Sequence, residues 1–103
     1  MDGALRAIAE PRRREILRIV LDSEHTAGEI ASQFEVSRPA VSQHLRILKD
    51  AGLIVERRLG TRRLYRARPE RLTELREFLD ELWGDSLARL KEVTEGEMRK
   101  RQV

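Results

Sequence analysis

Two helix-start signals stand close together in the middle of the chain and restrict the folds open to it. Thr26, with Glu29 three residues later, has the form of a capping box, in which each side chain accepts a free backbone N–H at a helix start. Ser37 is a favourable N-cap, and Pro39 costs little in a first helical turn. The helix that starts at Thr26 must therefore be short. This spacing predicts a helix-turn-helix over about residues 27–51, although a generic helical hairpin has the same layout.

Further helices are expected on the N-terminal side of this pair. Residues 3–9 favour a short helix, and a second should start at Pro11, because proline lacks the N–H that is unsatisfied in a first turn. The second helix should run to about Asp22. Its buried residues are expected to be Ile16, Leu17 and Val20, with Leu21 as a further candidate.

The segment after Gly52 has the character of a β-hairpin. Strand-forming residues stand at both ends of residues 53–67, and Gly60 lies in the middle. This pattern predicts strands over 53–58 and 62–67. A two-stranded ribbon with a cationic tip beside a helix-turn-helix is a wing. The cations of the tip are Arg57, Arg58, Arg62 and Arg63.

Charge is concentrated in the middle of the chain. The chain has 103 residues and a formal charge of +3, yet residues 37–52 carry +2 and residues 53–68 carry +5, while both flanking segments carry −2. A basic segment between acidic ones is typical of a surface that binds a polyanion. An arginine-rich surface exposed only to solvent is the alternative.

A helix drawn through residues 37–52 has two faces. Val41, Leu45 and Leu48 form an apolar ridge directed at a core. His44 falls within the same apolar arc, so we expect it to be structural and hydrogen-bonded to a neighbour. Arginine and glutamine pair well with guanine and adenine edges in the major groove of double-stranded DNA. The residues expected to read bases on the opposite face are Arg38, Pro39, Ser42, Gln43 and Arg46.

Other polar residues are expected to contact the DNA backbone. Such contacts position a protein on the duplex without specifying its sequence. The candidates are Ser37, Lys49, Arg57, Arg58, Arg62 and Arg63.

A long helix is expected to start near Pro69 and to run over about residues 70–95. Its apolar residues fill nearly half of the helix circumference, and a helix that rests only on its own domain needs a stripe of about 100°. The surplus predicts a homodimer, since most such assemblies are two-fold. The expected interface residues are Leu5, Ile8, Leu75, Phe78, Leu79, Leu82, Trp83, Leu87 and Leu90.

Composition excludes several classes of function. The chain has no cysteine, which excludes disulfides, zinc–thiolate sites and cysteine catalysis. We find no nucleophile–base pair, phosphate-binding glycine loop or metal constellation, so no enzyme activity, cofactor or metal is expected. No apolar run approaches the roughly 20 residues of a membrane span, and no leader-like segment opens the chain. We therefore expect a soluble cytoplasmic protein associated with the nucleoid.

Three stretches of the sequence resemble the arsenic-repressor (ArsR) family of bacterial winged helix-turn-helix regulators. They are "AIAEPRRREILRIVL", "SRPAVSQHLRILKDAGLI" and "RRLGTRRLYRARP". The resemblance implies a homodimeric repressor that reads an inverted-repeat operator with Arg38, Pro39, Ser42 and Gln43. Many members sense metals through cysteines or through His/Asp/Glu pairs on the last helix. Because residues 27–34 contain no thiol and the last helix no histidine, this sequence is similar to the family's cysteine-free branch.

Together these features predict one domain over residues 1–103. Its fold class is mainly α with a small β-hairpin, a dimeric winged helix-turn-helix of order α-α-α-α-β-β-α. The leading function is a sequence-specific repressor that binds an operator in double-stranded DNA. A ligand- or metal-switched sensor of the same fold and a winged-helix protein-interaction module are the alternatives, and any small-molecule effector is unknown.

Overall fold

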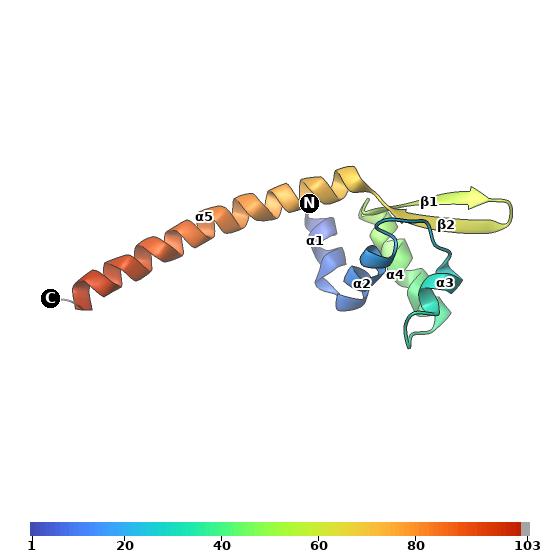
Figure 1. Ribbon diagram of the computed structural model, residues 1–103, viewed down its shortest axis with the longest axis horizontal. Helices are drawn as coiled ribbons and strands as arrows, with labels where there is room; N and C mark the ends of the chain where they lie inside the picture. The colour runs from blue at the N-terminus through green and yellow to red at the C-terminus, as the bar shows by residue number, and fades with distance from the viewer. Residues whose placement is uncertain (102–103) are drawn as a thin grey trace.

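A computed structural model describes the backbone of residues 1–101 and the side chains of residues 1–97. Figure 1 shows a winged helix-turn-helix body from which one long helix extends. The predicted order of five helices and two strands is confirmed. The elements are α1 (Asp2–Ala9), α2 (Pro11–Ile19), α3 (Ala27–Ala31), α4 (Arg38–Asp50), β1 (Ile54–Leu59), β2 (Arg62–Ala67) and α5 (Pro69–Arg101).

The corner between α1 and α2 is closed by charged side chains. The carboxylate of Glu10 accepts a hydrogen bond from the backbone N–H of Arg13 and so caps α2. In return, the guanidinium groups of Arg13 and Arg14 donate to the last carbonyls of α1, at 2.6 Å to Ala7 and 2.7 Å to Ile8. Carbonyls at a helix end need such partners because they have none within the helix.

The two predicted helix starts of the helix-turn-helix are confirmed. The side chain of Thr26 accepts from the N–H of Glu29, and the carboxylate of Glu29 accepts from the N–H of Thr26. Ser37 caps α4 by accepting from the N–H of Ala40 at 3.3 Å. Gly52 follows the end of α4 with φ +78°, a conformation that glycine adopts at little cost.

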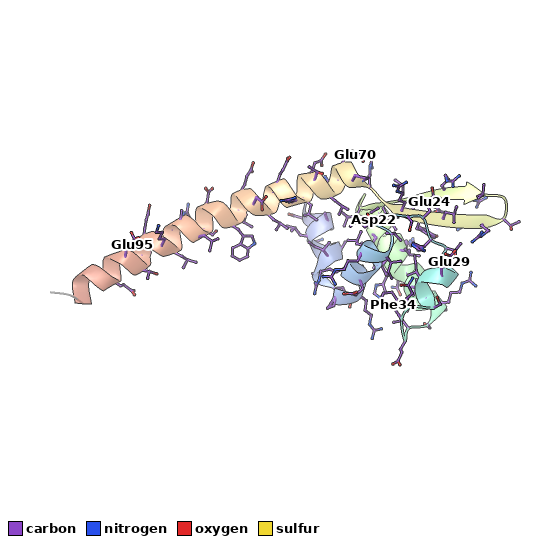
Figure 2. All side chains as sticks on the ribbon, viewed as in Figure 1. Asp22, Glu24, Glu29, Phe34, Glu70 and Glu95 are labelled. Atoms are coloured by element: carbon purple, nitrogen blue, oxygen red, sulfur yellow. The ribbon has the colours of Figure 1, made fainter. Side chains whose placement is uncertain are left out.

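A continuous apolar core joins all the helices to the wing. Leu21, a candidate for burial, is 48% exposed, because α2 ends at Ile19 and the following turn directs this side chain outward. Phe34 lies beyond the end of α3 and packs partly against the core (Figure 2). The buried core residues are Ala4, Ala7, Ile16, Leu17, Val20, Ile30, Val41, Leu45, Leu48, Leu53, Ile54, Ala67 and Leu75.

The wing is an antiparallel ribbon that is tied to the helical body. Its register pairs Glu56 with Tyr65, Arg57 with Leu64 and Arg58 with Arg63. The loop before α3 adds a short bridge to β2, in which His25 and Tyr65 exchange backbone hydrogen bonds of 3.1 and 2.8 Å. This bridge was not predicted, and it fixes the base of the wing against the start of the helix-turn-helix.

The long helix α5 packs on the body only over its first turns. Leu75 is 5% exposed, and Leu72 and Leu79 pack partly against the core. The helix then extends away from the other elements, so that the molecule is 72 Å long (Figure 1). It was expected to end near residue 95 and continues to Arg101.

Candidate nucleic-acid interface

The two predicted faces of α4 are confirmed by burial. Val41, Leu45 and Leu48 are each at most 1% exposed and hold the helix against the body. The five predicted base-reading side chains are all exposed on the opposite side. They are Arg38, Pro39, Ser42, Gln43 and Arg46.

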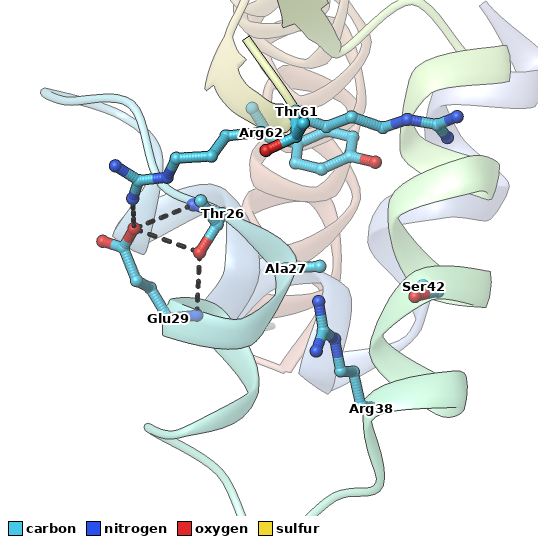
Figure 3. Close-up of a pocket in the computed structure, with 9 residues that line it drawn as sticks. Thr26, Ala27, Glu29, Arg38, Ser42, Thr61 and Arg62 are labelled. Atoms are coloured by element: carbon cyan, nitrogen blue, oxygen red, sulfur yellow. Dashed lines mark hydrogen bonds and ion pairs between the residues drawn. The ribbon is translucent and has the colours of Figure 1, made fainter. Parts of the chain in front are cut away.

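A cleft lies between this exposed face, the start of α3 and the wing. It has a volume of about 490 Å³, and Figure 3 shows Arg38 and Ser42 on one side of it and Arg62 above the capping box. Four of the sequence-predicted residues, two from α4 and two from the wing, are therefore brought to one concave surface: Arg38, Ser42, Arg62 and Arg63. The lining residues are Thr26, Ala27, Glu29, Arg38, Ser42, Thr61, Arg62, Arg63 and Tyr65.

A neighbouring hollow of about 380 Å³ follows α4 toward its C-terminal end. Arg46 and Lys49 border it from the helix, and Glu56 and Arg63 border it from the wing. Arg63 therefore lies between the two hollows. The two hollows share Ser42, Arg63 and Tyr65 and together form one groove between α4 and the wing, which the carboxylates of Glu29, Asp50 and Glu56 also border.

Of the four predicted wing arginines, Arg62 and Arg63 border this groove, whereas Arg57 and Arg58 do not. The register places Arg57 opposite Leu64 and therefore on the other face of the ribbon from Arg58 and Arg63, because alternate residues of a strand point to opposite faces. Its guanidinium forms a two-pronged contact with Glu24 at 2.9–3.1 Å.

Most of the predicted backbone-contacting cations are paired with carboxylates. Lys49 Nζ lies 2.7 Å from Glu56, and Arg63 Nε lies 3.4 Å from the same carboxylate. The hydrogen bond from Lys49 lowers the pKa of Glu56, and the same bond raises the pKa of Lys49. Arg62 Nη2 lies 3.0 Å from Glu29, whose pKa is lowered chiefly by the hydroxyl of Thr26.

Sequence reasoning missed the acidic partners of these cations. Glu24 and Glu29 lie 33 residues before their arginines, so no local pattern connects them. For Glu56 the sequence does contain a hint of an ion pair, because this residue is the single acidic one in segment 53–68, whose net charge is +5. A lone carboxylate among six arginines is a candidate for an internal partner.

His44 is half-buried and held by α2, as predicted. Its Nδ1 lies 3.4 Å from Arg13 Nη1, and its Nε2 lies 3.8 Å from a carboxylate oxygen of Glu10. These contacts join the recognition helix to the α1–α2 corner, so the histidine has a structural role.

The predicted interface residues of the two outer helices fall into three groups. Leu75 is buried in the core of its own chain, and Leu5, Ile8, Phe78 and Leu79 are half-buried. The remaining four are more than half exposed, and Val93 continues their stripe at 60%. These four are Leu82, Trp83, Leu87 and Leu90.

The described part of the chain offers neither a metal site nor a membrane-spanning helix. Within it, no group of three or more His, Cys, Asp or Glu side chains is arranged to hold a metal ion. No helix in it combines the length and the apolar character that crossing a membrane requires.

Comparison with known proteins identifies the family. The model of the family described as "Bacterial regulatory protein, arsR family" matches residues 10–55. The chain is 41% identical over 96 residues to the "HTH-type transcriptional regulator Rv2034" of Mycobacterium tuberculosis, a match that covers 93% of this chain and 90% of that protein. The chain belongs to the ArsR family.

The chain is also similar to further transcriptional regulators. The chain is 43% identical over 60 residues to the "Transcriptional repressor SdpR" of Bacillus subtilis, which covers 58% of this chain and 67% of that protein. A crystal structure titled "Possible transcriptional regulator for arsenical resistance" is similar with a TM-score of 0.76 and 41% identity, over 87% of this chain and 93% of that chain. This ArsR-family chain is thus a DNA-binding transcriptional regulator and not an enzyme.

Proposed function

We propose that this ArsR-family chain is a homodimeric repressor that binds an inverted-repeat operator in double-stranded DNA without a bound metal. One observation carries the proposal: Arg38, Ser42 and Arg46 on the exposed face of α4 border the same groove as Arg62 and Arg63 of the wing. In it, Arg38, Pro39, Ser42, Gln43 and Arg46 read base edges. Ser37, Lys49 and the wing arginines contact phosphates, Arg57 from the far side of the ribbon.

The geometry of α4 supports insertion into the major groove. Its N-terminal half carries four of the five proposed base-reading residues, and the N-terminal part of the recognition helix usually contacts base edges in this motif. Arg38 and Arg46 make no ion pair with the described residues, so their guanidinium groups are available for guanine.

The exposed stripe of α5 supports the homodimer. A second copy of this helix would bury Leu82, Trp83, Leu87 and Leu90. Leu5 and Ile8 of α1 are half-buried in the single chain and complete the proposed interface. Leu75 is left out of the proposed interface because its own chain already buries it. A two-fold dimer places its recognition helices about 34 Å apart, which predicts operator half-sites one DNA turn apart.

Metal independence rests on the side chains present. The chain has no thiol, and both histidines have other partners: His25 contacts Ser23 and Glu29, and His44 contacts Arg13 and Glu10. Titration calorimetry of the purified protein with Zn²⁺ and Ni²⁺ should show no stoichiometric binding. A protein of this kind would act in the cytoplasm on the nucleoid.

The test of the proposal is sequence discrimination. Duplexes enriched from a random-sequence library by the purified protein should contain an imperfect palindrome. Fluorescence anisotropy should then give an affinity for this operator about 10³-fold or more above that for a scrambled duplex at physiological salt. Equal affinities for the two duplexes would exclude a sequence-specific repressor.

A further inference from the structure

We propose that Glu24, Glu29 and Glu56 are internal counter-charges that hold the backbone-contacting cations in the free protein and so limit its sequence-independent affinity for DNA. The inference rests on the proposed function, because it assumes that these cations meet phosphates. It adds to that function three acidic residues that set the strength of binding without touching a base.

Glu56 is the centre of this arrangement. Its side chain is only 15% exposed and lies between the C-terminal part of α4 and the wing, with Lys49 at 2.7 Å and Arg63 at 3.4 Å. One carboxylate therefore neutralises cations from both elements that border the groove. A phosphate that approaches either cation must compete with a charge already in place.

Glu24 and Glu29 act on the other two paired cations. Glu24 receives three hydrogen bonds from Arg57, in the two-pronged geometry that a phosphate would also accept. Glu29 receives Arg62 at 3.0 Å while it also caps α3 (Figure 3). Figure 2 shows both acidic residues beside the wing.

The proposed DNA-contacting cations differ in their ion pairs. Four of the five proposed backbone-contacting cations, Lys49, Arg57, Arg62 and Arg63, are paired, whereas the proposed base-reading Arg38 and Arg46 make no ion pair within the described part of the chain. Phosphate contacts supply most of the binding to non-specific DNA, and base contacts supply the discrimination. Pairing most of the phosphate-contacting cations reduces the attraction to DNA of arbitrary sequence and leaves the base-reading arginines free.

The geometry of the ion pairs is also compatible with a scaffold that positions the wing for binding. The two roles predict opposite changes in affinity. If the carboxylates compete with phosphates, their removal strengthens binding, because the cations no longer have to exchange partners. If they position the cations, their removal weakens binding, because the wing loses its orientation.

The experiment uses the variants Glu24→Gln and Glu56→Gln in the full chain, which remove a charge and keep the side-chain shape. The matched control is Glu35→Gln, because Glu35 is exposed in the turn before α4 and makes no ion pair with the described residues. Anisotropy titrations are made with the enriched operator and with its scrambled duplex. Thermal unfolding of each variant verifies that the fold is retained.

We expect each variant to bind both duplexes about two- to fivefold more tightly than the control does, as the strength of exposed ion pairs implies. NMR of the arginine side chains gives a readout without DNA: Glu24→Gln should move the Nε–H signal of Arg57 and leave that of Arg38 in place. An affinity equal to that of the control, or lower, would overturn the inference. Failure of the wild-type protein to discriminate the two duplexes would overturn the proposed function instead, while the scrambled duplex would still test the counter-charges.

Discussion

The carboxylate of Glu29 joins the start of the helix-turn-helix to the tip of the wing. It accepts from the hydroxyl and the N–H of Thr26 and also receives Arg62. These contacts, led by the hydroxyl of Thr26, lower the pKa of Glu29 below the ordinary value of 4.5. One ionised group thus keeps two elements in register at the edge of the cleft.

We expect this residue to give the protein an acid-dependent stability. Because its pKa is lower in the folded protein than in the unfolded chain, Glu29 stabilises the fold above pH 4.5, and this contribution is lost as the pH falls through the folded-state pKa. The Tm of Glu29→Gln should lie below that of the wild type at pH 7, and the two should converge toward pH 3. A Tm difference that stays constant over this range would contradict the assignment.

Substitutions should distinguish the residues that read bases from those that contact the DNA backbone. Gln43→Ala should cost about 1–3 kcal/mol on the operator and leave scrambled DNA unchanged, because a base contact is lost. Arg58→Ala should weaken binding to both duplexes and reduce the slope of log K against log salt by about 0.9. Arg58 is the suitable wing residue because it makes no ion pair with the described residues. Salt-dependent anisotropy measures both effects, and a uniform loss in both variants would refute this division of roles.

At the scale of elements, helix starts were predictable and helix ends were less so. Thr26, Ser37 and Pro11 each satisfy or remove a free N–H at a fixed position, so the sequence marks the start directly. The expected end of α5 near residue 95 was too early. Gly96 stands there, but a glycine within a helix costs only about 1 kcal/mol, and strong helix formers flank it.

The candidate site was predictable where local periodicity decides it. The helix drawn through residues 37–52 separated the buried and exposed faces of α4 correctly, including the position of His44. It could do so because helix geometry fixes the direction of every side chain. The ion pairs of Glu24 and Glu29, and the bridge between His25 and Tyr65, depend on how distant segments pack. No spacing in the sequence encodes them.

The junction between α4 and the wing should be sensitive to its glycine. Gly52 has φ +78°, and the Cβ of an alanine would meet only ordinary contacts with Arg71 at 3.8 Å, so the cost of Gly52→Ala comes from the backbone. We expect a loss of about 1–2 kcal/mol in the free energy of unfolding in urea. Gly3→Ala is the control, because Gly3 lies within α1 with open space around it, and this change should be neutral or stabilising. Equal effects would contradict the strained backbone at Gly52.

At the scale of the whole molecule, the body and the extension of α5 differ in what holds them. The body has a shared core of helices and wing, whereas no side chain of α5 that the structure describes beyond Leu79, over residues 80–97, is buried. In proteins most of the stability of a helix comes from the packing of its apolar face, and here that face has no partner within the described chain. We therefore expect its helicity to depend on a second copy.

Leu87→Gln should dissociate the proposed dimer without unfolding the body. Leu87 is 57% exposed in the single chain, and a two-fold dimer would bury one Leu87 from each of its two chains. Loss of both contacts should weaken association by about 2–4 kcal/mol, or roughly 30- to 1000-fold in Kd. Sedimentation measures the association, and emission of Trp83, the single tryptophan, should shift to the red on dissociation. Glu81→Gln is the control on the acidic side of the helix, and an equal effect there would argue against the stripe.

The unburied stripe of α5 also has a consequence for gene dosage. While most chains are single, the amount of paired protein rises with the square of the chain concentration, so doubling synthesis raises the operator-competent form about fourfold. A cell could thus obtain a steep response from this repressor without an inducer. The sharpness of that response would be set by Leu82, Trp83, Leu87 and Leu90, residues of the helix α5, which extends away from the wing (Figure 1).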